Sequence, residues 1–166
     1  ADFFVICTIA VDSDNNKYIV DIYRNRISPA EQPNLLIDEF KKYRPRRMMI
    51  ETVGYQEALR VAVRELMREE ELYIPGLEAG VKPRNSKSER LLSLVPLFAK
   101  GTFYFRAEDI KAQQEFLSYP KGKHDDIMDA IWTALDGAKP CRIAEFQKLS
   151  EDDWRNPKKT LDWLTM

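Results

Sequence analysis

The sequence contains few of the residues that build disulfide scaffolds, zinc sites or membrane spans. Its 166 residues include two cysteines, Cys7 and Cys141, which lie far apart, and one histidine, His124. So few cysteines favour a reducing compartment over a disulfide framework or a zinc site. No apolar run approaches the roughly 18 residues that span a bilayer, and no charged leader with an apolar core and a cleavage site occurs. We therefore expect a cytoplasmic protein without membrane contact.

An excess of charge of one sign is also missing. Lysine and arginine number 26, aspartate and glutamate 27, and the formal net charge is −1. A nucleic-acid partner would therefore have to use local basic patches rather than a global field. Internal repeats, low-complexity tracts and a glycine-rich loop that could cradle phosphate do not occur. Hydrophobic content of 44% and charged content of 32% are typical of one globular domain with a sizeable core.

Turn residues and hydrophobic periodicity predict an alternation of strands and helices. Residues 3–11 and 17–24 are rich in β-branched and aromatic side chains, and the turn-forming segment 12–16 between them predicts a β-hairpin. That segment lacks the glycine and the distal glutamate of a calcium-binding loop. Helices are predicted at 33–43, at 56–70, from the end of the basic segment 82–90 through residue 98, at 110–117 and from 127 onward. Short strands are predicted at 46–51, 72–75 and 102–106. This order predicts an α/β fold, a mixed sheet with helices on its faces.

Two features suggest how the chain is divided. Residues 1–138 carry the periodic pattern and are predicted to form the domain, while residues 139–166 are expected to be an appendage packed on it or a tail that contacts a partner. The sequence begins with Ala1 instead of methionine and enters a strand at once. We therefore expect an excised domain whose amino-terminal neighbour is missing.

The most informative segment is 123–130, Lys-His-Asp-Asp-Ile-Met-Asp-Ala, at the start of an apolar helix. At about 100° per residue, Asp126 falls beside the apolar stripe and Asp129 lies one turn further along, while Asp125 flanks Asp129. Carboxylates this close raise each other's pKa unless a cation offsets the charge. Clustered carboxylate oxygens suit Mg²⁺ or Mn²⁺.

A purely structural explanation competes with the metal site. Aspartates in a first helical turn favour the helix dipole and cap free N–H groups. Asp129 weakens this explanation, because it lies a full turn inside the helix and aspartate is a poor helix former. His124 alone is more often a capping or packing residue than a metal ligand.

Glu51 and a basic segment complete the pattern. Glu51 follows the apolar residues 48–50 at the end of a predicted strand, where ligands gather in open α/β sheets, although a solvated strand end is an equal alternative. Strand and helix ends can converge, and a two-metal site needs carboxylates from several elements to hold ions about 3.5–4 Å apart. A basic segment nearby could steer a phosphate backbone toward these carboxylates; the alternative is that it only forms a solvated face. Its basic side chains are Lys82, Arg84, Lys87 and Arg90.

These residues carry a resemblance to a known family. The order of Ile50-Glu51, Lys87-Ser88-Glu89-Arg90, the segment Gly101-Thr102-Phe103-Tyr104-Phe105 and the block 119–130 resembles the carboxyl-terminal nuclease domain of phage large terminase subunits. The resemblance covers roughly residues 1–136, and its most specific part is 124–130. It implies a ribonuclease H-like fold and metal-dependent cleavage of concatemeric double-stranded DNA.

The resemblance also implies roles, partners and a location. Glu51, Asp126 and Asp129 correspond to catalytic metal ligands, with Asp125 as a neighbouring ligand, and the cofactor is Mg²⁺ or Mn²⁺, expected as two ions. The expected partners are double-stranded DNA, an upstream ATPase domain of the same chain, the portal and the small terminase subunit. The expected location is the cytoplasm of a bacterial host.

One departure from the family pattern leaves alternatives open. The family's first catalytic aspartate lies on a strand before the hairpin that begins this sequence, and Asp2 resembles a secondary acidic residue after that strand. The first ligand and a central strand are therefore expected to be missing, as is the ATPase. Two alternatives follow: a catalytically incomplete DNA- or portal-binding module of the packaging motor, and another ribonuclease H-like nuclease such as a junction resolvase.

Overall fold

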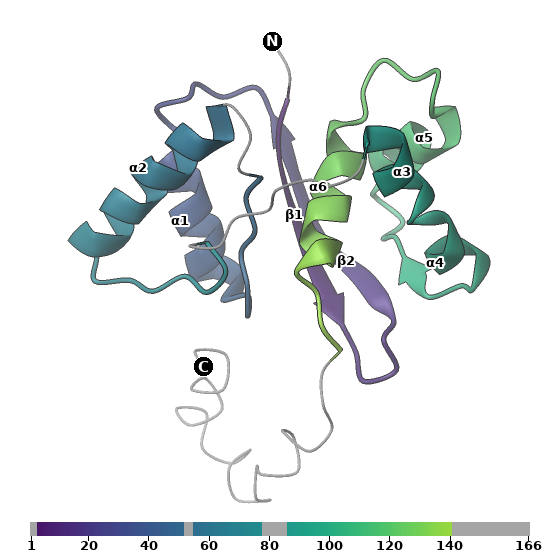
Figure 1. Ribbon diagram of the computed structural model, residues 1–166, viewed down its shortest axis with the longest axis horizontal. Helices are drawn as coiled ribbons and strands as arrows, with labels where there is room; N and C mark the ends of the chain where they lie inside the picture. The colour runs from purple at the N-terminus through teal and green to yellow at the C-terminus, as the bar shows by residue number, and fades with distance from the viewer. Residues whose placement is uncertain (1–2, 52–54, 78–85, 141–166) are drawn as a thin grey trace, which may run out of the picture.

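A mixed three-stranded sheet with helices on both faces forms the fold in a computed structural model, which describes residues 3–51, 55–77 and 86–140 (Figure 1). The strands are β1 (Phe4–Val11), β2 (Lys17–Asn25) and β3 (Phe103–Tyr104). The helices are α1 (Gln32–Tyr43), α2 (Tyr55–Glu69), α3 (Lys87–Leu92), α4 (Val95–Ala99), α5 (Ile110–Ser118) and α6 (Asp126–Asp136). The predicted α/β class is confirmed. None of the described helices is long and apolar enough to cross a bilayer.

The predicted hairpin is confirmed, and its turn uses the residues expected to form it. β1 and β2 pair in antiparallel fashion from Phe4↔Asn25 to Val11↔Lys17. Both carboxylate oxygens of Asp12 accept hydrogen bonds from Asn16, at 2.8 and 2.9 Å. The aspartate therefore stabilises the turn. β3 adds to the other edge of β2 in parallel, giving the order β1-β2-β3.

Two apolar clusters fill the two sides of the sheet. One lies under α1 and α2 and includes Ile37, Val63 and Ile74, while the other lies under α3–α6 and includes Ile127 and Ile131. β1 contributes to both clusters: Phe4 and Ile6 pack against the first, and Val5, Cys7 and Ile9 against the second. This alternation follows from the two-residue period of a strand. β1 therefore separates the two halves of the core.

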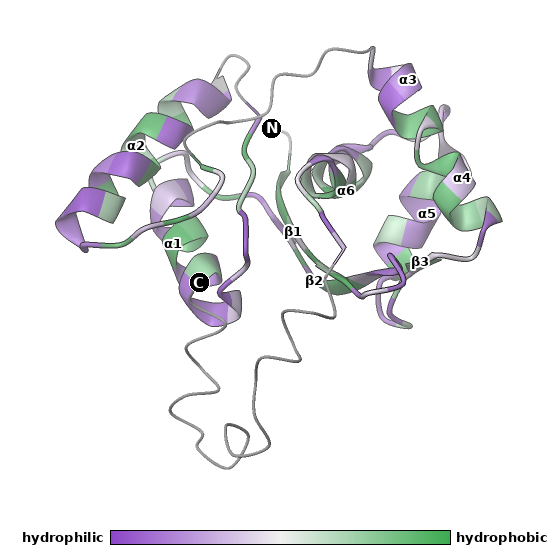
Figure 2. Cartoon of the chain, turned by 60° about the horizontal axis from the view of Figure 1, so that its bottom comes forward, coloured by the Kyte–Doolittle hydropathy of each residue, from purple (hydrophilic) through white to green (hydrophobic). Residues whose placement is uncertain are grey.

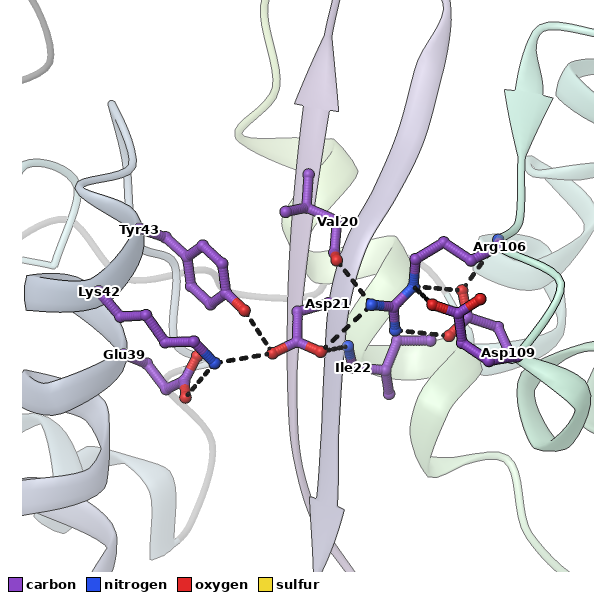
Figure 3. Close-up of polar contacts among 9 residues, drawn as sticks. Val20, Asp21, Ile22, Glu39, Lys42, Tyr43, Arg106 and Asp109 are labelled. Atoms are coloured by element: carbon purple, nitrogen blue, oxygen red, sulfur yellow. Dashed lines mark hydrogen bonds and ion pairs between the residues drawn. The ribbon is translucent and has the colours of Figure 1, made fainter.

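A polar bridge centred on Asp21 ties α1 to the sheet (Figure 3). The Tyr43 hydroxyl donates to Asp21 at 2.6 Å, and Lys42 Nζ lies 3.2 Å from the same oxygen. Arg106 Nη1 lies 3.5 Å from the other oxygen of Asp21 and donates to the carbonyl of Val20 at 2.8 Å. Burial opposes ionisation of Asp21, but the hydrogen bonds from Tyr43 and Lys42 outweigh it, and its pKa is lowered. The bridge therefore fixes the position of α1 relative to β2.

Three short predicted elements differ in the structure. Residues 46–50 belong to no described strand, Glu51 forms only an isolated bridge, and residues 72–75 are not a strand. These two segments instead contact each other through a hydrogen bond from the Met48 N–H to the Pro75 carbonyl, at 2.8 Å. The strand predicted at 102–106 is reduced to β3. The helix ending at residue 98 is divided into α3 and α4, since Pro96 lies in the first turn of α4 and favours a new helix start.

Candidate functional site

The three aspartates of the 123–130 segment lie at the start of α6, and the one at the N-cap position does not cap the helix. Asp125 occupies the N-cap position, but its side chain makes no capping hydrogen bond. The backbone N–H of Ile127 donates instead to the carboxylate of Glu115 in α5, at 2.9 Å. The free N–H of Ile127 in the first turn of α6 thus has its acceptor in Glu115 and not in Asp125. The simple capping explanation therefore fails for Asp125. The side chain of Asp125 makes its contact elsewhere, with Lys87.

Lys87 joins two of these carboxylates. Its Nζ lies 2.7 Å from Asp125 Oδ1 and 2.7 Å from Asp129 Oδ2. Burial alone would lower the pKa of Lys87, but the hydrogen bonds to Asp125 and Asp129 outweigh it, and the pKa is raised. The ammonium group therefore stands where a cation is electrostatically favoured.

Arg90 joins Glu51 to the same group. Its Nη1 lies 2.6 Å from Glu51 Oε1, and its Nη2 lies 3.7 Å from Asp129 Oδ1. The guanidinium group also lies 4.9 Å from the ring centre of Trp132, and Arg90 is only 9% exposed. Glu51 and Asp129, 78 positions apart in the sequence, thus share one guanidinium group.

Asp126 faces the same region from the first turn of α6. Its Oδ2 lies 3.7 Å from His124 Nδ1, and the His124 ring contacts Phe3 edge-on at 5.3 Å. Glu51, Asp126 and Asp129 all line one large groove beside β1. The structure therefore brings the three predicted catalytic residues to one surface, and their role as metal ligands stays a prediction.

The carboxylate groups of the site are chemically suited to bind a divalent cation, but their present positions do not form a complete binding site. Three carboxylates (Glu51, Asp125 and Asp129) contact the two cationic side chains of Lys87 and Arg90, and a fourth, Asp126, lines the same groove as Glu51 and Asp129, so negative charge is in excess. Asp129 Oδ1 is buried and accepts no hydrogen bond from the described residues, so it is an acceptor that a cation could use. Within residues 3–51, 55–77 and 86–140, however, no three histidine, cysteine or acidic side chains are arranged to hold a metal ion. Carboxylate oxygens suit Mg²⁺ or Mn²⁺. Binding of such an ion requires that Lys87 or Arg90 first leave its contacts with the carboxylates.

The predicted DNA-binding residues separate into two groups. Lys87 and Arg90 lie at the carboxylates and are held by them. Lys82 and Arg84 lie outside the described residues. A DNA-binding role therefore stays a prediction for all four.

Glu115 and Arg24 complete the site and were missed by the sequence analysis. Glu115 is 7% exposed, and Arg24 Nη2 lies 3.6 Å from its Oε1. Burial raises the pKa of Glu115, although the N–H of Ile127 and the charge of Arg24 act in the opposite direction. One signal was available: Glu115 lies three positions after the buried Ala112, on the buried face of α5.

Comparison with known proteins gives one match. Residues 1–137 match the family model described as the terminase RNaseH-like domain. No curated protein and no solved structure matches the chain.

Proposed function

Because the chain belongs to the terminase ribonuclease H-like domain family, we propose that it is a metal-dependent endonuclease that cuts concatemeric double-stranded DNA during genome packaging. The observation that carries the proposal is the group of four carboxylates contributed by Glu51 and by the start of α6. Such a group from separate elements is what phosphodiester hydrolysis with two metal ions requires. The ribonuclease H-like fold agrees with this reaction class.

Each residue of the group has a proposed task. Glu51, Asp126 and Asp129 would hold Mg²⁺ or Mn²⁺, with Asp125 beside them, and the bound ions would activate water and stabilise the leaving oxygen. Lys87 is partly exposed, so it can exchange its carboxylate contacts for a phosphate oxygen as DNA enters. Arg90 is buried and keeps Glu51 beside α6.

The proposed setting follows from the family. The substrate is double-stranded DNA, and an ATPase domain of the same polypeptide, the portal and the small terminase subunit are the proposed partners. The proposed location is the cytoplasm of a bacterial host cell.

The test is Mn²⁺-dependent nicking of supercoiled plasmid. Glu51→Ala and Asp126→Asn should abolish nicking and leave the circular dichroism spectrum unchanged. Asp38→Asn removes an exposed carboxylate on α1 and is the matched control, which should retain activity.

Two other outcomes would contradict the proposal. DNA binding without cleavage, with and without Mn²⁺, would favour a non-catalytic DNA- or portal-binding module. The ion pairs of Lys87 and Arg90 with the carboxylates are compatible with that alternative, because they neutralise the acidic residues without a metal ion. A strong preference for branched over linear duplex would favour a junction resolvase on the same fold.

A further inference from the structure

Two tyrosines form an exposed aromatic pair at the end of the sheet where the hairpin turns. Tyr18 of β2 and Tyr104 of β3 are neighbours across the two strands. Their rings stack with centroids 4.9 Å apart and an angle of 11° between the ring planes. Tyr18 is 38% exposed and Tyr104 45% exposed. Tyrosine is enriched where one polypeptide contacts another, so this pair is a candidate contact surface.

The packing of the sheet explains why the pair is exposed. Ile19 and Phe103, the adjacent residues on the two strands, point to the opposite face and are buried in the cluster under α3–α6. On the face of the tyrosines, the cluster under α1 and α2 includes no described residue of 17–20 or 103–104. Figure 2 shows α1 and α2 on the β1 side of the sheet, away from β3. The described helices therefore leave this part of the sheet uncovered.

The turn beside the tyrosines is acidic. Asp12 accepts a hydrogen bond from the Tyr18 hydroxyl at 3.0 Å. Its pKa is lowered, chiefly by the side-chain hydrogen bond from Asn16, so it is ionised at neutral pH. Asp14 is exposed, whereas Lys17, the next base along the chain, is 8% exposed. Two aromatic rings thus lie beside negative charge, and the residues that form this tyrosine surface are Asp12, Asp14, Tyr18 and Tyr104.

The chemistry of the tyrosine surface is wrong for DNA and suits a basic segment that contains proline. Its carboxylates repel phosphate. It also lies at the opposite end of β1 from Phe3 and His124, a strand length of roughly 25 Å from the candidate nuclease site. Aromatic rings on a protein surface bind proline in an extended chain, and they stack with guanidinium groups that neighbouring carboxylates can pair.

One segment with this composition follows α6 in the sequence. Residues 154–159, Trp-Arg-Asn-Pro-Lys-Lys, carry three bases, one proline and no acid. Residues 151–153, directly before them, are acidic, so the positive charge is confined to these six positions. The segment lies beyond the described residues, and it matches the tyrosine surface in both charge and ring chemistry.

The chain leaves α6 at the correct end of the molecule for this contact. The end of α6 and the hairpin turn lie at the same end of the sheet (Figure 1), and Gly137 and Ala138 line the same groove as Asp12. Fully extended, residues 141–153 would span up to about 45 Å, so the basic segment can reach the tyrosines. A tether of this kind raises the local concentration of the segment to the millimolar range, which populates even a weak contact.

We propose that residues 154–159 dock on the tyrosine surface of the same molecule. Pro157 packs on the two rings, and the basic side chains on either side of it face the carboxylates of the turn. This contact lies at the opposite end of the sheet from Glu51 and the aspartates of α6, and it does not depend on nuclease activity.

NMR of the whole 166-residue protein tests the contact from the side of the segment. Arg155→Ser combined with Lys158→Ser should shift the ring signals of Tyr18 and Tyr104, because the segment loses two of the charges that hold it. Arg142→Ser combined with Lys148→Ser removes two bases that also follow α6 but lie outside the segment. This matched control should leave the ring signals unchanged.

Trypsin cleavage tests the contact from the side of the sheet. Tyr104→Ala and, as a second variant at an exposed turn position, Asp14→Ser should each release the segment. The initial rate of cleavage after Lys158, relative to cleavage after Lys148, should then rise by about threefold or more, the loss expected for a tethered millimolar contact. Val61→Ala, which removes an exposed apolar side chain of α2, should leave the ratio unchanged.

Three results would overturn the proposal. Unchanged ring signals in the first double variant would show that the segment does not touch the tyrosines. Equal shifts in the control pair would show a general effect of charge rather than docking. Ring signals that change in the parent protein on dilution would assign the segment to a second copy of the chain. None of these readouts uses DNA or a metal ion, so they fail or succeed independently of the proposed function.

Discussion

Glu115 accepts a hydrogen bond from the backbone N–H of Ile127 at 2.9 Å. A buried glutamate from α5 therefore caps the start of α6, the helix that carries Asp126 and Asp129. Side-chain caps normally come from the N-cap residue itself. Here the N-cap residue, Asp125, contacts Lys87 instead. The start of α6 is thus capped from α5, while Asp126 and Asp129 line the groove.

Replacing Glu115 should therefore affect both stability and the site. Glu115→Ala leaves the Ile127 N–H without its acceptor and the Arg24 guanidinium without its carboxylate, and should lower the free energy of unfolding by about 1–3 kcal/mol. Glu115→Gln keeps an acceptor oxygen and should lose less. Urea unfolding measures both variants, with Glu108→Ala, on the exposed surface, as the control. Equal stability of all three proteins would mean that the cap contributes nothing.

The pH dependence of stability should report Glu115 directly. Its folded pKa is raised above the ordinary value of 4.5 by burial, so the folded protein binds this proton more tightly than the unfolded chain. The resulting stabilisation is present below the unfolded pKa and is lost as the pH rises through the folded pKa. Subtracting the Glu115→Gln profile from that of the parent should isolate a decline over this interval. A flat difference between the two profiles would contradict the raised pKa.

Lys87 should compete with divalent cations. Its ammonium group contacts Asp125 and Asp129 at 2.7 Å each, and exposed pairs of this kind are worth about 0.2–1 kcal/mol each. Lys87→Met should therefore bind Mn²⁺ more tightly by about 1 kcal/mol, roughly fivefold. Calorimetry measures the affinity, and Lys111→Met, at an exposed position of α5, controls for the loss of one positive charge. Weaker binding by Lys87→Met alone would show that the lysine helps to build the metal site.

The same lysine should also contribute to DNA affinity. Each phosphate neutralised contributes about −0.9 to the slope of log affinity against log salt. Lys87→Ala should therefore make the slope less steep by about that amount, with little dependence on DNA sequence. Lys111→Ala serves as the comparison. An unchanged slope would mean that Lys87 contacts only its own carboxylates.

Local signals explain why much of the fold could be predicted. The hairpin follows from Asp12 and Asn16, whose turn contacts lie within five residues. Helix α1 follows from its apolar period and the proline soon after it, and its predicted and observed bounds differ by one residue. For these elements, the residues that determine the structure are neighbours in the sequence.

The remaining features depend on contacts between distant residues. Residues 46–51 have the composition of a buried strand, and Met48 and Ile50 are indeed buried, but a strand also needs a pairing partner beside it. The sequence identified Lys87 and Arg90 as members of one basic segment without showing that they contact Asp129 and Glu51. The Glu115 cap likewise depends on the packing of α5 against α6. Single-sequence reasoning identifies such residues but cannot pair them.

The nuclease activity of the protein should be low but measurable. Three predicted ligands, Glu51, Asp126 and Asp129, line one groove, yet the carboxylates of the described part of the chain do not form a closed metal site. A two-metal mechanism needs both ions held in place. The 166-residue protein should therefore nick plasmid DNA slowly in Mn²⁺, with little sequence preference.

This prediction needs a control that separates catalysis from folding. Glu51→Ala should abolish the remaining nicking and leave the circular dichroism spectrum unchanged. Rapid cleavage by the 166-residue protein would show that its own carboxylates suffice, and Asp2 or Asp12 would become candidates for the remaining ligand. DNA binding without any cleavage in Mn²⁺ would reject the endonuclease, because the acidic residues would then hold no pair of catalytic ions.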